Sequence, residues 1–389
     1  MLVQFTVENH RSIKESAVIS FAASKDKSFE ENLIYLNRKK SLFPVLAIYG
    51  ANAAGKTNVL HAMMTMREMV VGNTSKVPKG QNLIWEPFAC TSNPTSFEMV
   101  FFYEGIRYAY GFSFDDKKIY NEYLYYWPNG REALIFSRDK DTYEFRENIN
   151  EQMILSKRTA NNKLYLVSSN DWNLPQTEKA YQWFAENMIC LMDNESIDSE
   201  TLAVIVSGND KKAQILRELM LADLGIVDIT IKNNLENVPV ITTTHKITNE
   251  NGTSEYFKLL MNQESAGTQR FLTRIGGWLK ALENGSLLVV DEIEDSLHPL
   301  LVKRLIEMIQ DKSVNKKGAQ LIFTTHDSML LDLKFFRRDQ IWFTEKNNET
   351  CATEVYCLTA FSPRKGENVR KGYLRGRFGA IPFIGGDMI

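Results

Sequence analysis

The most constraining feature of this 389-residue chain is the octapeptide GANAAGKT at residues 50–57. It fits the pattern GxxxxGK[ST] at every fixed position, and it stands between an apolar, strand-like run (residues 45–49) and a helix-compatible run (residues 58–64). A strand, a glycine-rich turn and a helix N-terminus together direct backbone N–H groups and the positive end of the helix toward a polyphosphate. The pattern therefore predicts that Lys56 reaches the β- and γ-phosphates of a nucleotide and that the Thr57 hydroxyl binds Mg²⁺. The predicted nucleotide contacts in this segment are Gly50, Asn52, Ala53, Ala54, Gly55, Lys56, Thr57 and Asn58.

A second motif ends in two carboxylates. The apolar run at residues 286–290 is followed directly by Asp291 and Glu292. A buried strand that delivers acids at its C-terminal end is how α/β nucleotide sites hold Mg²⁺ and polarise water. We expect Asp291 to bind the metal and Glu292 to act as the general base for the attacking water.

A third apolar run, residues 320–325, leads into His326. On a neighbouring strand this imidazole would sense or stabilise the γ-phosphate, although a lone histidine after a strand is more often structural. Because the run follows the other two motifs in this order, we predict a catalytic role for His326.

Residues 262–270, NQESAGTQR, precede a stretch with apolar residues at helical spacing. Small residues that open a helix form a second anion-binding terminus, which would involve Ser265 and Gly267. The alternative is an ordinary helix with Ser265 or Thr268 as its N-cap, and a capping residue can also face a phosphate.

In this order, the phosphate loop, the ESAGTQR-type signature, LLVVDE, the following EDSLHP and the TTHD switch resemble those of ABC-type ATPase heads. The similarity is to the AAA-family branch that includes the OLD (overcoming-lysogenisation-defect) and SMC/RecF-like ATPases. The opening VENHRSI at residues 7–13 resembles that branch's N-terminal NFRS strand, with His10 in place of the usual aromatic. Arg11 would then reach the nucleotide, or it is a solvated edge residue.

The resemblance implies an α/β fold, namely an ABC-type ATPase head with a RecA-like mixed sheet, an N-terminal antiparallel β meander and a helical insert. It also implies that ATP and Mg²⁺ are the ligands and that heads pair as a homo-oligomer around ATP. One head would supply Lys56, and its partner would supply Ser265 and Gly267. ABC-type heads also place a glutamine after the phosphate-loop helix, for which Gln81 is available.

The ending YLRGRFGAIP at residues 373–382 resembles the C-terminus of ATPases from two-gene abortive-infection and anti-phage modules. That resemblance implies a sensor and scaffold that holds a separately encoded toxin, expected to be a Toprim-like nuclease, until a nucleic-acid or phage-protein trigger arrives. The alternative is a DNA-repair-like, ATP-dependent clamp that binds DNA directly. Residues 364–377 carry six basic residues against one acid, which fits a solvated surface or a contact with a partner or nucleic acid.

Composition predicts a cytoplasmic protein with no membrane partner. The chain is 44% hydrophobic and 24% charged, and its formal net charge of −2 argues neither for nor against nucleic acid. The four cysteines form no CxxC pair, which predicts reduced thiols. No apolar run approaches the roughly 18 residues that a membrane-spanning helix needs.

The periodicities predict an N-terminal ATPase lobe (1–125), a mixed or helical insert of unknown role (126–254) and a C-terminal ATPase lobe (255–389). Alternating residues predict a hairpin within 1–24 and an antiparallel meander over 96–126, whose aromatic residues we assign to the core. Helices are predicted at 58–71, 176–193, 209–224 and 299–310, and strands at 226–248. In the 209–224 helix, Leu216, Leu219, Met220 and Leu224 form one apolar stripe, which we assign to core packing.

Overall fold

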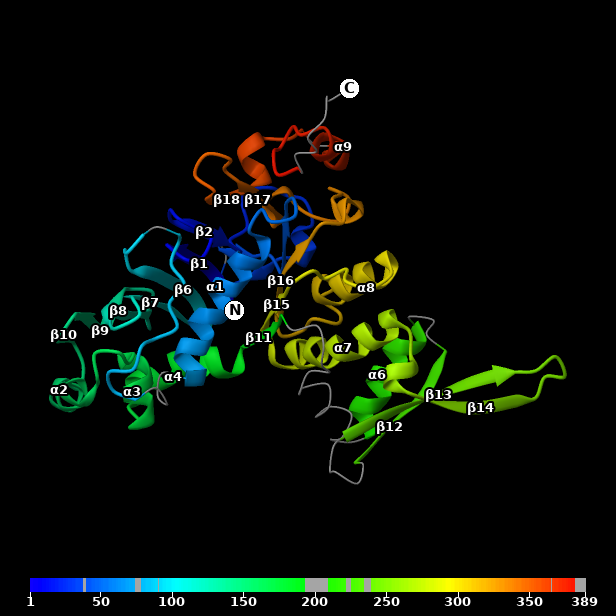
Figure 1. Ribbon diagram of the computed structural model, residues 1–389, viewed down its shortest axis with the longest axis horizontal. Coiled ribbons are helices and arrows are strands. Elements are labelled where there is room, and N and C mark those ends of the chain that lie inside the picture. The colour runs from blue at the N-terminus through cyan, green and yellow to red at the C-terminus, as the bar shows by residue number, and fades with distance from the viewer. Residues whose placement is uncertain are drawn as a thin grey trace.

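The computed structural model describes residues 1–37, 40–73, 78–89, 91–192, 209–221, 225–233, 239–364 and 366–381 of the chain. Within these residues, helices join two large β-sheets and a smaller three-stranded sheet (Figure 1). The helices are α1 (Lys56–Glu68), α2 (Ile149–Arg158), α3 (Tyr165–Asp171), α4 (Pro175–Glu186), α6 (Asn209–Leu221), α7 (Ala266–Asn284), α8 (Pro299–Gln310) and α9 (Val369–Leu374).

The central sheet contains the three apolar runs that precede the sequence motifs. Its strand order is β11 (Met188–Leu191), β15 (Leu287–Val290), β16 (Gln320–Thr325), β5 (Val45–Tyr49), β17 (Ile341–Lys346) and β18 (Thr353–Cys357). Neighbouring strands are parallel, except that β18 runs antiparallel to β17. Strands covered on both faces are apolar at successive positions rather than at alternate ones. Every residue of β5, β15 and β16 is accordingly buried.

Alternate residues of these parallel strands enter two separate hydrophobic cores. Leu46 and Ile48 of β5 pack with α1 and the antiparallel sheet. Val45, Ala47 and Tyr49 of the same strand pack with α7 and α8 on the opposite face. Because side chains alternate between the two faces of a strand, the central sheet forms the middle layer between the two cores.

The second large sheet is antiparallel throughout and contains the N-terminal hairpin and the meander. Its order is β10 (Thr142–Phe145), β9 (Ala133–Asp139), β8 (Ile119–Trp127), β7 (Ile106–Phe114), β6 (Thr95–Tyr103), β1 (Leu2–Glu8) and β2 (Ala17–Ser20). Phe97, Phe101, Tyr110 and Phe112 are at most 2% exposed, so these meander aromatics belong to the core. The lobe boundary expected at residue 125 falls inside β8, and β9 and β10 continue the same sheet.

The smaller sheet consists of β12 (Ile226–Asn233), β13 (Pro239–Thr248) and β14 (Ser254–Leu260), paired antiparallel. The β13–β14 ribbon projects from the body beside α6 and α7 (Figure 1). At the base of this ribbon, His245 Nε2 lies 2.6 Å from a carboxylate oxygen of Glu264, two residues before α7 begins. A further pair, β3 (Ile34–Tyr35) and β4 (Ser41–Leu42), lies near the N-terminal hairpin, where Ala22 forms a bridge to Leu42.

The predicted α/β architecture, with a mixed central sheet and an antiparallel meander, is confirmed. The 299–310 helix and the strands at 45–49 and 320–325 have the expected bounds. The helix expected over 176–193 is wrong beyond Glu186, because residues 188–191 instead form β11 and pair with β15. Tertiary pairing at a sheet edge outweighs the local helical pattern there.

The apolar stripe expected on the 209–224 helix is also partly wrong. Leu219 is buried together with Ile215, whereas Met220 is 62% exposed. The helix ends at Leu221 in the described part of the chain, and Leu224 lies outside the described residues.

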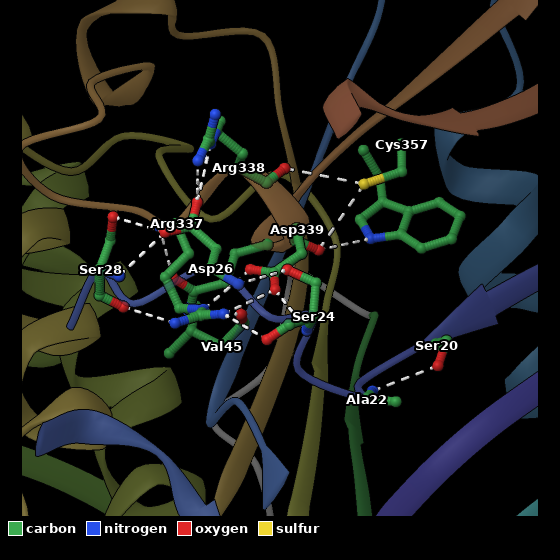
Figure 2. A network of polar contacts seen from close by, with 12 residues as sticks. Ser20, Ala22, Ser24, Asp26, Ser28, Val45, Arg337, Arg338, Asp339 and Cys357 are labelled. Carbon is green, nitrogen blue, oxygen red and sulfur yellow. Dashed lines mark hydrogen bonds and ion pairs between the residues drawn. The ribbon is translucent and has the colours of Figure 1, made fainter. Parts of the chain in front are cut away.

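A buried ion-pair network joins the segment after β2 to the segment before β17 (Figure 2). The Arg337 guanidinium donates to both carboxylate oxygens of Asp339, at 2.9 and 2.8 Å, and to the Ser28 carbonyl at 2.5 Å. Arg338 Nε donates to Asp26 Oδ2 at 2.7 Å. Burial alone would raise the pKa of Asp26, but hydrogen bonds from Ser28 and Arg338 outweigh it and lower the pKa to about 2. The network therefore holds the segment that follows the N-terminal hairpin against the segment that leads into β17.

Candidate nucleotide site

The phosphate loop turns from β5 into α1 at the carboxyl edge of the central sheet. Ala53 (φ 62°) and Gly55 (φ 97°) both adopt the left-handed conformation that this tight turn requires. Gly55 is the N-cap of α1, and no side chain caps the helix. The first N–H groups of α1 therefore have no side-chain acceptor, which suits them to an anionic ligand.

Lys56, the first residue of α1, folds back over this loop. Its ammonium donates to the carbonyls of Gly50, at 3.0 Å, and Ala51, at 3.1 Å. Burial lowers the pKa of Lys56, and the nearby carboxylates of Glu292 and Asp291 act in the opposite direction. The two carbonyls thus hold the ammonium inside the loop that would surround a phosphate.

The two predicted metal ligands touch each other. Thr57 Oγ1 donates to Asp291 Oδ2 at 2.9 Å, although the two residues lie 234 positions apart in the chain. Thr324 Oγ1, on the adjacent strand β16, donates to Asp291 Oδ1 at 2.5 Å. Neighbouring ligands of an octahedral Mg²⁺ ion bound at about 2.1 Å lie roughly 3 Å apart, so the Thr57 and Asp291 oxygens fit one ion.

Glu292 follows in a strained conformation that its surroundings fix. Its φ of 44° is left-handed, which costs a non-glycine residue about 1–3 kcal/mol. Its N–H donates to Thr324 Oγ1 at 2.8 Å. Arg274 of α7, which is 2% exposed, donates to the carbonyls of Asp291 at 3.1 Å, Glu292 at 3.3 Å and Ile293 at 3.0 Å. The buried Arg274 guanidinium thus fixes the backbone of Glu292, the predicted general base, and of its two neighbours.

His326 follows β16, next to the phosphate-loop strand. The β16–β5 register pairs Thr325 with Tyr49, so His326 and Gly50 are the next residues on the two strands. A carboxylate oxygen of Glu294 lies 3.0 Å from His326 Nδ1. The expected convergence of His326 with the phosphate loop at this edge therefore follows from the strand pairing.

The signature segment forms the exposed N-terminus of α7. Ser265 is its N-cap and accepts from the Thr268 N–H at 3.1 Å, so of the two candidate caps Ser265 occupies the position. Gly267 packs against the loop after β15, because a Cβ at this residue would lie 2.9 Å from the Ser296 carbonyl oxygen. Within the part of the chain that the structure describes, no hydrogen bond joins Ser265 or Gly267 to the phosphate loop.

Arg11 makes a bidentate ion pair with Glu86, through Nε at 2.9 Å and Nη2 at 3.1 Å. The ligand atoms of Glu86, His10 and His61 lie within 4.8 Å of one another, and these three residues are of the types that bind metals. Burial lowers the pKa of His10 to about 3 and also lowers the pKa of His61, and the Arg11 charge contributes to both shifts. Arg11 pairs with both oxygens of Glu86, so in this conformation the carboxylate belongs to an ion pair that lies beside the two imidazoles.

Three residues with structural roles at or near the site are not predicted from the sequence: Thr324, Arg274 and Glu264. Arginine is almost never fully buried without partners, so its place among apolar residues in 271–279 was the available signal for Arg274. The partners of Thr324 and Glu264 come from distant segments and left no local pattern.

Other predicted residues lie away from this centre. Gln81 donates its N–H to the Pro78 carbonyl at 3.1 Å, and its own carbonyl accepts from Asn162 at 3.0 Å. Tyr373 is 6% exposed and Phe378 is fully buried, so the aromatics of the basic C-terminal stretch pack inside this chain. Arg377 pairs with Glu367. Lys365 and residues 382–389 lie outside the described residues.

Cys190, Cys351 and Cys357 are free, and Cys90 lies outside the described residues. Across the described residues, no helix combines the length and apolar character that crossing a membrane requires.

Comparison with known proteins identifies a family and similar solved structures. The family model described as "AAA domain, putative AbiEii toxin, Type IV TA system" matches residues 45–332. Among solved structures, the chain is similar to the SmcHead bound to the C-winged helix domain of ScpA, with 14% identity over 93% of this chain and 99% of that chain, at a TM-score of 0.43. It is also similar to cbiO1 from Clostridium perfringens, part of the ABC transporter complex cbiONQ, with 11% identity over 96% of each chain, at a TM-score of 0.35.

The comparison with curated proteins finds no match. The family match runs from the first residue of β5 to a point beyond His326, so it spans the phosphate loop, the signature, the acidic strand and the switch histidine. This chain therefore belongs to the family of AAA domains described as a putative AbiEii toxin of Type IV TA systems.

Proposed function

We propose that this chain is a Mg²⁺-dependent ATPase whose nucleotide state controls a separate effector. The observation that carries the proposal is the contact between Thr57 and Asp291. It joins the start of the phosphate-loop helix to the end of the acidic strand, at the spacing of two adjacent Mg²⁺ ligands. The sequence predicts both residues as metal ligands, each from a separate motif.

Each residue has a defined part in the proposed reaction. Lys56 and the N-terminus of α1 compensate the negative charge of the β- and γ-phosphates. Glu292 accepts the proton of the attacking water, and Thr324 and Arg274 keep its backbone in place. Mg²⁺ held by Thr57 and Asp291 would neutralise developing charge on the phosphates. His326 stabilises the γ-phosphate from the adjacent strand.

The active site is proposed to be shared between two copies of the chain. Ser265 and Gly267 open a 19-residue helix at the surface, where a second copy's nucleotide can approach them. Closure of two heads around ATP would place this terminus against the γ-phosphate, and hydrolysis would reopen the interface. The interface would thereby report the nucleotide state to a partner.

As a cytoplasmic sensor and scaffold, the chain would hold a separately encoded toxin, a Toprim-like nuclease, and release it when a phage protein or nucleic acid is sensed. The Type IV toxin–antitoxin description of the family supports a two-component role. The alternative is a clamp that binds DNA directly, for which the exposed arginines of the C-terminal stretch would be the contact. Tight DNA binding that weakens steeply with salt would favour the clamp, whereas copurification of the adjacent gene product would favour the scaffold.

The chemistry is tested by comparing Glu292→Gln with Lys56→Ala. Glu292→Gln removes the base but keeps the shape, so it should slow ATP turnover by about 10²-fold or more while trapping bound ATP. Lys56→Ala should weaken ATP binding and turnover together. Turnover is measured with and without Mg²⁺, and binding by equilibrium titration with ATP. Wild-type turnover in Glu292→Gln would contradict the assignment of Glu292 as the general base.

A further inference from the structure

Glu294 is a buried carboxylate at the edge of the site with no part in the chemistry above. Its side chain is 10% exposed. Oε1 accepts the backbone N–H of His326 at 2.7 Å and that of Asp327 at 3.3 Å. The same oxygen lies 3.0 Å from His326 Nδ1. Oε2 is buried and has no partner among the described residues.

One carboxylate therefore fixes both the backbone and the ring of His326. An ionised carboxylate only accepts hydrogen bonds, so the ring must donate from Nδ1–H. The imidazole is 56% exposed, which leaves its far side accessible. With Nδ1 turned inward, Nε2 is the nitrogen that can meet a ligand.

The loop that carries Glu294 is itself tied to β16. The Ile293 N–H donates to the Thr324 carbonyl at 3.1 Å, two residues before His326. Arg274 binds the Ile293 carbonyl at 3.0 Å from the other side. Glu294 is thus held between α7 and β16, while the metal ligand Asp291 and the base Glu292 belong to the same loop. The charged or titratable groups around Glu294 further include Asp327, Lys56 and the Tyr49 phenol, whose buried hydroxyl has no partner in the described part of the chain.

We infer that Glu294 is a positioning residue for ATP hydrolysis: it holds the Nδ1 side of His326 so that Nε2 faces the terminal phosphate of the bound nucleotide. The inference rests on the proposed ATPase function and deepens it. During hydrolysis, the Glu294 carboxylate on the Nδ1 side stabilises positive charge on the ring while Nε2–H donates to a phosphate oxygen. Glu294 acts on the reaction through His326 and does not touch the nucleotide.

The test compares Glu294→Gln and Glu294→Ala in the full-length protein. The glutamine carbonyl can still accept the same hydrogen bonds but carries no charge. We expect kcat of Glu294→Gln to fall about 10-fold, with KM for ATP within about 2-fold, because the affected contact is made in the transition state. The kcat of Glu294→Ala should fall further, because both the His326 ring and the backbone N–H groups of His326 and Asp327 lose their hydrogen-bond acceptor. Glu307→Gln, an acid-to-amide change at an exposed site of α8, is the matched control and should leave kcat unchanged.

A double-mutant cycle separates positioning from a general structural effect. If Glu294 acts through His326, Glu294→Gln should have no further effect on kcat in a His326→Ala background. Nitrogen NMR of the His326 ring adds a direct readout, because its Nδ1 and Nε2 shifts should change in Glu294→Gln. An equal loss of kcat in both backgrounds, or an unchanged kcat in Glu294→Gln, overturns the inference. Absence of ATP hydrolysis in the wild-type protein would instead overturn the proposed function.

Discussion

The N-termini of α1 and α7 are two candidate phosphate sites built in opposite ways. The α1 terminus has a left-handed glycine as N-cap and no side-chain cap, and its lysine folds over the preceding loop. The α7 terminus is closed by its own serine, whose Oγ accepts the Thr268 N–H and lies 2.9 Å from the Thr268 hydroxyl. The first terminus needs a ligand to satisfy its N–H groups, whereas the second is already satisfied in part.

The two termini also differ in the parts of the chain that they contact. Thr57 at the start of α1 contacts Asp291 across the central sheet, so this terminus is assembled with the acidic strand inside one chain. The α7 terminus contacts the loop after β15 through Gly267 and through the Arg270–Asp295 ion pair. Its exposed end is therefore fixed relative to the loop after β15, and among the described residues no hydrogen bond joins Ser265 or Gly267 to the phosphate loop. This difference supports a division in which α1 binds ATP in its own chain and α7 serves the ATP of a second chain.

Matched glycine-to-alanine changes give the largest expected contrast. At Gly55 the left-handed φ of 97° and a Cβ only 2.1 Å from Thr353 Oγ1 add strain and a clash, so Gly55→Ala should reduce ATP affinity at least about 100-fold. At Gly267 the backbone is not left-handed, but an added Cβ would lie 2.9 Å from the Ser296 backbone carbonyl oxygen, so the loop after β15 must shift. Gly267→Ala should therefore keep ATP affinity but lower the free energy of unfolding by about 1–3 kcal/mol and slow hydrolysis.

Equilibrium binding of ATP and the thermal unfolding of each variant check this contrast. A loss of ATP affinity in Gly267→Ala as large as that in Gly55→Ala would show that both termini bind the same nucleotide within one chain.

A smaller effect is expected where α7 meets the catalytic loop. Arg274→Lys keeps the positive charge, but the single ammonium cannot reproduce the fork that binds three successive carbonyls. Glu292 should then leave its left-handed conformation part of the time, and kcat should fall about 10-fold with KM for ATP nearly unchanged. Steady-state kinetics measure this change, and Asn284→Ala, at an exposed residue in the last turn of α7, is the control on the same helix. A normal kcat in Arg274→Lys would mean that α7 does not support the base.

The parts of the fold that the sequence predicts well are those set by contiguous residues. The phosphate loop, β5, β16 and α8 depend on local patterns of glycine, apolar runs and proline, and their bounds agree with expectation. Residues 188–191 form a strand only because β15 supplies a partner from 99 residues further on, a contact that no local pattern contains. The same distinction applies to the site. Asp291 is predictable because it directly follows an apolar strand, whereas the roles of Arg274 and Glu294 depend on contacts between α7, β15 and β16, which no local pattern contains.

The division between the two helix termini is tested most directly by mixing two inactive variants. Lys56→Ala disables the phosphate loop, and Ser265→Arg disables the signature, so neither homodimer retains an intact shared site. A heterodimer combines the lysine of one chain with the serine of the other in one of its two sites. If the subunits exchange and the sites act independently, an equimolar mixture should recover roughly a quarter of wild-type ATPase activity. No recovery despite demonstrated subunit exchange, or a fully active wild-type monomer at every protein concentration, would contradict the shared site.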